Sequence, residues 1–386
     1  MKKIKLYNKI AKVGTDVFDR ERYEVGEAVE SPDAIMVRSA ALHELPFGPE
    51  LKAISRCGAG VNNIPIPRCT EAGVVVFNTP GANANGVKEL AIAALMLASR
   101  DIVEGVNWTA TLAGSEDVAK AVEKGKSQFA GNEIAGKTLG VIGLGAIGGL
   151  VANAADALGM TVVGCDPFLS VNGAWALSRN VKRAASYEDI YKQADYITLH
   201  VPANDETRNM INKDTLAEMR DGVRIINLSR ADIVNADDLC EAIASGKVKK
   251  YVTDFPTEKT IGKDGIITIP HLGASTAESE DNCAVMAAHE LAEFLELGNI
   301  KNSVNFPNVS LPRGSGHRVC VMHRNIPAVL SKLTTALSDV GINIENLASG
   351  SKGDVAYTII ETDRPAPDIA LEKFGLIFEV IRVIVI

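Results

Sequence analysis

A glycine-rich turn between two apolar stretches constrains the fold of this chain more than any other feature. The stretch TLGVIGLGAIGGLVANAADALGMTVVGCDP, residues 138–167, predicts a strand, a turn with Gly143, Gly145 and Gly148, a helix and a second strand. In that order the first glycine permits a tight turn and the second lets the backbone approach a pyrophosphate, while the third allows close helix–strand packing. The helix N-terminus favours the anion. We therefore expect a dinucleotide-binding βαβ unit here.

The second strand of this unit is expected to end at Asp166, eighteen residues after Gly148. A carboxylate there would accept hydrogen bonds from both adenosine ribose hydroxyls and would repel a 2′-phosphate. Because the strand, the helix, the second strand and the terminal Asp are all present, we interpret the motif as a cofactor site rather than a structural glycine turn. The predicted cofactor is NAD, in preference to NADP.

Short β-rich runs alternate with helical stretches through most of the chain, from AIMVRS at 34–39 to IITIPHLG at 266–273. This alternation predicts parallel βαβ units, and 386 residues are more than one core usually supports. The composition changes near residue 300, where the stretch NIKNSVNFPNVSLPRGSGH predicts a linker. After it, the pattern predicts a separate small βαββαβ module.

Composition excludes several classes of function. The net charge of −8 argues against nucleic acid as a partner, which would require a basic face. Six cysteines lie far apart with no CxxC pair, which favours reduced thiols over disulfides or a zinc site. No stretch approaches the ~20 apolar residues of a transmembrane helix, and the N-terminus lacks the apolar core of a signal peptide. We expect a soluble cytoplasmic protein with no membrane partner and no metal.

Candidate catalytic residues follow the predicted strands. In a doubly wound sheet the ligand lies beyond the carboxyl ends of the strands, and those ends carry His200, Arg230, Asp254 and His271. Oxidation of a 2-hydroxy acid needs a base, a cation that holds the carboxylate, and a group that sets the pKa of the base. His271 can be the base and Arg230 the fork-shaped cation. Glu258 can raise the pKa of His271 and orient its ring.

Each of these residues also has an ordinary interpretation. A Pro-His step can simply satisfy a backbone group, Arg230 can form a surface ion pair, and Glu258 can be a solvated loop charge. Sequence spacing does not decide whether Glu258 and His271 form an acid–base couple, because a separation of thirteen residues along the chain can bring the two groups together or hold them apart. Like His271, His200 follows a predicted strand. Because Pro202 ends that strand abruptly, we interpret His200 as part of the wall of the cofactor pocket.

The order of GLGAIG, CDP, HVP, INLSRADIV, DFPTE and PHLGAST resembles the D-isomer-specific 2-hydroxyacid dehydrogenases over roughly residues 35–305. The resemblance implies that Arg230, Glu258 and His271 form the catalytic set and that Asp254 faces the nicotinamide carboxamide. The loop before Glu258 is one residue shorter than the usual pattern. The cofactor contacts that the resemblance implies are Gly143, Gly145, Ala146, Ile147, Gly148, Asp166, His200, Val201, Pro202, Thr207, Leu228, Ser229, Asp254, Gly273 and Ala274.

The same resemblance implies the architecture. We expect an α/β fold with two Rossmann-like doubly wound lobes, followed by a small α+β domain of the ACT type. The substrate lobe would comprise residues 1–97 and a return segment, 272–305, and the NAD-binding domain would span 98–271. A linker, 306–316, would lead to the ACT-like regulatory domain at 317–386. A homodimer or homotetramer is expected.

Within the family, VRSA, GAGVNNIP and the C-terminal module are most similar to the branch that acts on D-3-phosphoglycerate. The resemblance implies oxidation of this phosphorylated 2-hydroxy acid to 3-phosphohydroxypyruvate, the first step of L-serine biosynthesis. A phosphate needs at least one bidentate Arg, and among Arg38, Arg56, Lys88 and Lys126 the best candidate is Arg38. The substrate contacts that the resemblance implies are Arg38, Ser39, Ala59, Gly60, Val61 and Asn83. Lys88 departs from the family pattern, which more commonly has a small residue there, and we expect its charge to add affinity for the phosphate.

In the C-terminal module, HRNIPAVL and GINI resemble a serine-sensing pattern, which implies effector contacts at His323, Asn325 and Asn343. Ala328 stands where that pattern has glycine, and its methyl group could block close approach of a ligand. Feedback by L-serine and a module used only for assembly therefore stay open.

Two other functions also stay open. One is a different D-2-hydroxyacid dehydrogenase, such as a hydroxypyruvate or glyoxylate reductase, although that gives no reason for the C-terminal module. The other is a non-catalytic NAD-sensing scaffold, and the combination of Arg230, Glu258 and His271 argues against it.

Overall fold

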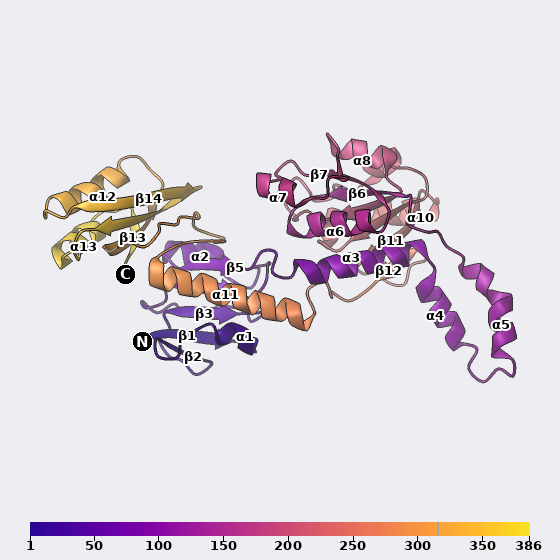
Figure 1. The fold of residues 1–386 in the computed structure, drawn as a ribbon, viewed down its shortest axis with the longest axis horizontal. Coiled ribbons are helices and arrows are strands. Elements are labelled where there is room, and N and C mark those ends of the chain that lie inside the picture. The colour runs from indigo at the N-terminus through magenta and orange to yellow at the C-terminus, as the bar shows by residue number, and fades with distance from the viewer. Residues whose placement is uncertain (315) are drawn as a thin grey trace. The chain divides into compact units, whose positions relative to one another are not determined.

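The computed structural model describes residues 1–314 and 316–386, so Ser315 in the expected linker lies outside the described residues. The chain divides into two compact units (Figure 1). Met1–Ala82 and Glu280–Ile386 form the first, and Asn83–Ser279 form the second. The boundaries expected at 97 and 271 concern family domains and stay a prediction.

The first unit contains a five-stranded parallel sheet in the order β2-β1-β3-β4-β5. Apolar side chains of the sheet, such as Met36 and Phe77, pack with Leu291 and Phe294 of the long helix α11. All four residues of β3 are buried, as expected for a parallel strand covered on both faces. The bounds are β1 Lys2–Tyr7, α1 Lys12–Thr15, β2 Tyr23–Gly26, β3 Ala34–Val37, β4 Ala53–Arg56, α2 Ile66–Glu71, β5 Val75–Asn78 and α11 Ala277–Leu297.

The second unit contains a seven-stranded parallel sheet in the order β12-β11-β10-β9-β6-β7-β8. One core cluster joins the sheet to α8, α9 and α10, and another joins it to α3 and α6, so helices cover both faces. The expected doubly wound arrangement is confirmed. Strand order reverses beside β6, which is where such sheets bind their ligands.

The strands of this unit are β6 Thr138–Ile142, β7 Thr161–Cys165, β8 Lys182–Arg183, β9 Tyr196–Leu199, β10 Val223–Asn227, β11 Val248–Thr253 and β12 Ile266–Thr268. Its helices are α3 Ala84–Ser99, α4 Ile102–Ala110, α5 Val118–Gly125, η1 Lys126–Phe129, α6 Ala146–Ala157, α7 Val171–Ala176, α8 Tyr187–Gln193, α9 Lys213–Glu218, η2 Ala231–Ile233 and α10 Ala236–Ala244.

Residues 317–386, which we call the small domain, have the βαββαβ order expected from the sequence. Their antiparallel sheet has the order β14-β15-β13-β16. Val321 and Ile360 pack under the helices of the small domain, while Cys320 and Ile359 belong to the core of the first unit. The bounds are β13 His317–Arg324, α12 Val329–Ser338, β14 Ile344–Lys352, β15 Val355–Thr362, α13 Asp368–Gly375 and β16 Val380–Val385.

Among the described helices, none combines the length and the hydropathy that crossing a membrane would require.

Candidate active site

The glycine-rich turn between β6 and α6 has the geometry that a pyrophosphate needs. Gly143 has φ +89°, and a Cβ there would lie 2.5 Å from the carbonyl oxygen of His200. A Cβ at Gly148 would lie 1.9 Å from the carbonyl oxygen of Gly143, whereas one at Gly145 would meet no atom within 4 Å. Gly145 is the N-cap of α6 and has no side chain to occupy the first amides of the helix, and Gly145 and Ala146 both line a cavity. These features fit a dinucleotide phosphate.

Asp166 follows β7 and is held at the mouth of the turn. Its Oδ2 accepts a hydrogen bond from the amide of Leu144 at 2.9 Å, and its Oδ1 accepts one from the amide of Phe168 at 2.8 Å. The carboxylate lines a cavity of about 280 Å³ between α6 and α7. Each oxygen keeps a further lone pair, so the geometry fits the adenosine ribose hydroxyls.

The loop after β9 closes on itself around Thr207. The hydroxyl of Thr207 donates to the carbonyl of Pro202 at 2.5 Å and accepts from the amide of Asn204 at 2.9 Å. His200 at the start of the loop contacts the Thr198 hydroxyl through Nε2 at 2.9 Å. Burial lowers the pKa of His200 to about 4, so the ring is neutral at physiological pH. This supports the interpretation of His200 as a wall.

Arg230 lies in the loop after β10, and the buried Asn227 organises that loop. The Asn227 Nδ2 donates to the carbonyl of Arg230 at 2.8 Å, and its Oδ1 accepts from the amide of Ser229 at 3.1 Å. The Ser229 hydroxyl donates to the carbonyl of Leu199 at 2.7 Å, which ties the loop to β9. The guanidinium of Arg230 is exposed. Asn227 was not predicted from the sequence, although a polar residue at the end of an apolar strand was a signal.

Phe255 brings Arg230 and His271 into one cluster. The guanidinium carbon of Arg230 lies 5.6 Å from the centre of the Phe255 ring, and the rings of Phe255 and His271 lie 4.5 Å apart between centroids. Arg230, Phe255 and His271 follow β10, β11 and β12, which are adjacent parallel strands, so their carboxyl ends meet at one edge. Sequence reasoning also missed Phe255, whose only signal was its place after Asp254.

Asp254 has a buried oxygen that is ready for a ligand. Its side chain is 1% exposed, and Oδ2 accepts a hydrogen bond from the amide of Gly273 at 3.2 Å. Among the described residues, Oδ1 has no hydrogen-bond partner. Burial raises the pKa of Asp254, while the Gly273 amide and the nearby charge of His271 act in the opposite direction. An unpaired buried acceptor costs about 1–3 kcal/mol, so this site fits an N–H donor such as a carboxamide.

Glu258 lies in an exposed turn between β11 and β12. Its loop is ordered by Thr257, whose amide donates to the hydroxyl of Thr260 at 2.9 Å. In the part of the chain that the structure describes, Glu258 and His271 share no hydrogen bond or ion pair. The couple therefore stays a prediction.

Comparison with known proteins identifies the family. Residues 92–274 match the model of the D-isomer specific 2-hydroxyacid dehydrogenase, NAD binding domain. A D-3-phosphoglycerate dehydrogenase of Escherichia coli strain K12 is 31% identical over 353 residues, which cover 86% of this chain and 81% of the relative. The chain belongs to the D-isomer specific 2-hydroxyacid dehydrogenase family. The prediction of NAD as the cofactor is confirmed.

Other members of this family are similar over different spans. A D-3-phosphoglycerate dehydrogenase of Synechocystis is 34% identical over 332 residues, 80% of this chain, but the chain spans only 57% of that relative. A solved 3-phosphoglycerate dehydrogenase of Entamoeba histolytica, with NAD+ bound, is 26% identical with a TM-score of 0.62. The match covers 79% of this chain and 98% of that one.

The substrate contacts expected for a D-2-hydroxyacid dehydrogenase divide between the two units. Arg38, Ser39, Ala59, Gly60 and Val61 belong to the first unit, and Asn83 and Lys88 belong to the second. Each unit thus contributes part of the predicted set.

Within the first unit, the guanidinium of Arg38 pairs with the carboxylate of Glu280, and Arg56 donates from Nε to the carbonyl of Arg38 at 3.1 Å. In the second unit, Lys88 pairs with Glu89 at 3.7 Å, and Lys126 pairs with Glu123 at 2.5 Å. Arg38, Lys88 and Lys126 therefore each have a carboxylate partner to exchange for a phosphate.

Two of the three predicted effector residues line one cavity of about 540 Å³ in the small domain, together with Ala328. His323 is buried, and its Nε2 and Nδ1 contact the Thr358 hydroxyl at 3.0 Å and the Arg324 carbonyl at 2.8 Å. Asn325 donates from Nδ2 to the carbonyl of Gly353 at 2.9 Å. Asn343 is not among the described residues that line the cavity.

Proposed function

We propose that this family member oxidises D-3-phosphoglycerate to 3-phosphohydroxypyruvate with NAD, the first step of L-serine biosynthesis. The observation that carries the proposal is the cluster of Arg230, Asp254 and His271 at the ends of three adjacent strands, with Phe255 in contact with two of them. The relatives of highest similarity named above are phosphoglycerate dehydrogenases, which supports the phosphorylated substrate.

The chain's own residues would hold the cofactor in three places. The amides at the start of α6 would bind the pyrophosphate, and Asp166 would bind the ribose hydroxyls. The unpaired oxygen of Asp254 would accept a hydrogen bond from the nicotinamide carboxamide. His200, Val201, Pro202, Thr207, Leu228, Ser229, Gly273 and Ala274 would form the walls. When bound, NAD supplies the acceptor for the hydride that leaves C2.

Arg230 would donate to the substrate carboxylate and the C2 oxygen through its planar fork. His271 would take the proton of the C2 hydroxyl as the C2–O bond gains double-bond character. Glu258 would stabilise the protonated ring of His271, which requires its loop to approach the ring once substrate is bound. Arg38 is the proposed principal phosphate ligand, and its partner Glu280 would have to release it.

We further propose that residues 317–386 form an ACT-type regulatory domain that binds a small amino acid, with L-serine as the candidate. The cavity beside His323 and Asn325 includes the first turn of α12, whose cap residue Ala328 makes no side-chain hydrogen bond. Free amides there suit a carboxylate. The Oδ1 of Asn325 and the Ser349 hydroxyl are acceptors for an ammonium group. Asn343 would contact the effector only from a second copy of the chain. We therefore also propose a homodimer or homotetramer. A cytoplasmic location is proposed as well.

The function is tested by steady-state rates with NAD and D-3-phosphoglycerate, D-glycerate or D-lactate. We expect kcat/KM for the phosphorylated acid to exceed the others by at least about 100-fold, because a charge-assisted phosphate contact is lost in the analogues. Equal rates on D-glycerate would contradict the substrate. His271→Asn should lower kcat by about 10²–10⁴-fold. Undiminished turnover by that variant would refute the assigned base, whereas no turnover of any of these acids by the wild-type chain would favour the scaffold.

The effector is tested separately by calorimetry with L-serine on the full chain. Binding that Asn325→Ala abolishes would support the regulatory domain, and the absence of any binding would favour a module used only for assembly.

A further inference from the structure

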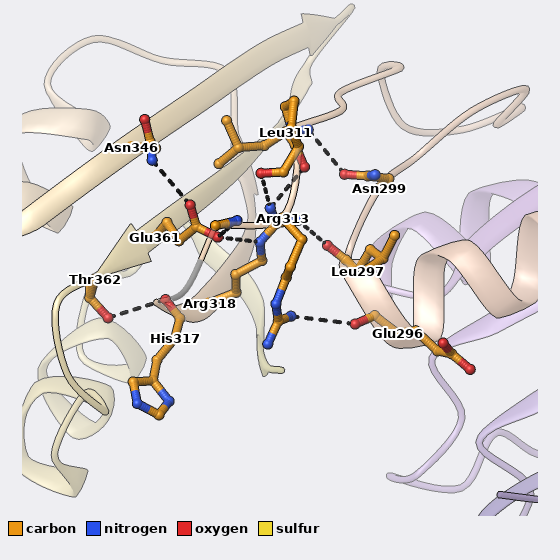
Figure 2. Close-up of polar contacts among 12 residues, drawn as sticks. Glu296, Leu297, Asn299, Leu311, Arg313, His317, Arg318, Asn346, Glu361 and Thr362 are labelled. Carbon is orange, nitrogen blue, oxygen red and sulfur yellow. Dashed lines mark hydrogen bonds and ion pairs between the residues drawn. The ribbon is translucent and has the colours of Figure 1, made fainter.

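A buried arginine of the small domain, Arg318, joins this domain to the rest of the first unit and forms an ion pair with Glu361 of the same domain. Arg318 and Glu361 are both fully buried, with 3.1 Å between Nε and Oε1 (Figure 2). The two terminal nitrogens of Arg318 donate to the carbonyls of Leu297 at 2.7 Å and Leu311 at 2.8 Å, one at the end of α11 and one in the segment after it. This joint ties the small domain to residues 297 and 311 by two hydrogen bonds, and removing either partner of the ion pair would leave a buried charge unpaired.

Packing strengthens the same joint. One face of the antiparallel sheet, with Cys320, Met322 and Ile359, shares a core with Phe294 and Phe306. The small domain thus packs against the rest of the first unit through residues of β13 and β15 on one face of its sheet.

The segment 302–305 continues the five-stranded sheet beyond its edge strand β5. The amide of Val304 donates to the carbonyl of Val76 at 2.8 Å, and Phe77 and Ser303 form an antiparallel bridge. The amide of Asn78 donates to the carbonyl of Asn302 at 3.5 Å. The position of the segment therefore determines the position of the end of β5.

Lys352, the last residue of β14 in the small domain, holds the other side of this segment. Its ammonium donates to the carbonyl of Ser303 at 3.0 Å and to that of Val304 at 2.8 Å. The backbone of β14 also approaches residues 307–309 closely, because a Cβ on Gly350 would lie 2.9 Å from Cγ2 of Val309. A charged donor makes these bonds stronger than neutral ones.

The end of β5 in turn holds residues 58–61, which we call the substrate segment. The Asn78 side chain donates from Nδ2 to the carbonyl of Ala59 at 2.6 Å, and the amide of Thr79 donates to the carbonyl of Gly58 at 3.1 Å. Hydrogen bonds thus connect Lys352 to the substrate segment through the segment 302–305 and β5.

We propose that Lys352 is a positioning residue that sets the geometry of the substrate segment from within the small domain. The proposal rests on the proposed function, in which Ala59, Gly60 and Val61 contact the substrate. It assigns the small domain a part in substrate binding that requires no effector.

The test compares Lys352→Met with the wild-type full chain. KM for D-3-phosphoglycerate should rise roughly three- to ten-fold while kcat and the Kd of NAD change less than about two-fold, because only the substrate segment moves. Lys352→Arg, which keeps a charged donor, should restore most of the affinity. Lys332→Met is the matched control, since Lys332 pairs with Glu379 inside the small domain at 2.7 Å.

Hydrogen exchange tests the same inference without substrate. In Lys352→Met the amides of Asn78, Thr79 and Val304 should exchange faster than in wild type, while those of the glycine-rich turn should not change. Unaltered exchange at these amides would overturn the proposal. An equal rise in KM in Lys332→Met would also overturn the proposal. The same holds for a fall in kcat of Lys352→Met as large as its rise in KM. If the wild-type chain does not turn over D-3-phosphoglycerate, the proposed function fails, and exchange at the amides of Asn78, Thr79 and Val304 still decides the role of Lys352.

Discussion

The ring of Phe255 lies 4.5 Å from the ring of His271, and the guanidinium of Arg230 lies 5.6 Å from the same phenylalanine ring. A single apolar side chain therefore contacts the proposed base and the proposed cation. Its quadrupole favours the guanidinium, and its bulk limits the orientations of the imidazole.

Phe255→Ala should lower kcat/KM for D-3-phosphoglycerate by about ten-fold, because the proposed base and the proposed cation both lose a support worth about 1 kcal/mol. The variant should still bind NAD, which calorimetry would establish. Phe255→Leu keeps part of the bulk and no aromatic face, so an intermediate rate would separate the two effects. An unchanged rate in Phe255→Ala would show that the contact does not matter.

The two glycines at the start of α6 should respond differently to the same substitution. Gly148→Ala places a Cβ 1.9 Å from the Gly143 carbonyl oxygen and should lower the free energy of unfolding by more than about 2 kcal/mol. Gly145→Ala meets no protein atom within 4 Å, and Gly145 has an ordinary φ of −65°. It should leave stability within about 0.5 kcal/mol but weaken NAD binding at least ten-fold, because the methyl group occupies the space proposed for the phosphate. Urea denaturation and calorimetry measure the two effects, and similar results for both variants would contradict this assignment.

Glu290 of α11 should make stability fall as pH rises. Burial raises the pKa of Glu290 from 4.5 to about 8, against the opposing hydrogen bonds of Asn302 and Ser55 and the nearby charge of Lys301. Between these two pH values the folded chain holds a proton that the unfolded chain has released. The free energy of unfolding should therefore fall by up to about 1.4 kcal/mol per pH unit through this window. Urea denaturation at pH 5.5, 6.5 and 7.5 measures how the free energy of unfolding depends on pH. In Glu290→Gln this dependence should be less steep than in wild type by the same amount per pH unit. The same pH dependence in wild type and in Glu290→Gln would exclude a contribution of Glu290.

Ala328 is in the left-handed region, with φ +69° and ψ 0°. A Cβ there is strained by about 1–2 kcal/mol, and glycine relieves the strain at an entropic cost of up to about 1 kcal/mol. Ala328→Gly should therefore raise the stability of the small domain by about 0.5–1 kcal/mol in thermal unfolding. Ala336→Gly, the same change inside α12, should lower it by at least about 1 kcal/mol. A loss of stability in both variants would count against strain at Ala328.

Much of the second unit could be predicted because its signals are local. Gly143, Gly148 and Asp166 belong to one continuous βαβ unit, and each lies where steric demands of a turn or a strand end place it. The βαββαβ order of the small domain followed from the same kind of pattern. Asn227 and Phe255 were not predicted, because their roles depend on partners in other loops.

What the sequence determined by itself is the set of parallel strands, the NAD turn and the residues that follow the strand ends. These depend on backbone geometry within a few tens of residues. Only the tertiary structure decided that Phe255 lies between Arg230 and His271, that Asp254 keeps an unpaired oxygen, and that Lys352 reaches the segment beside β5. Hydrogen bonds and ring contacts form over a few ångströms, and the spacing of residues along a chain does not specify distances on that scale.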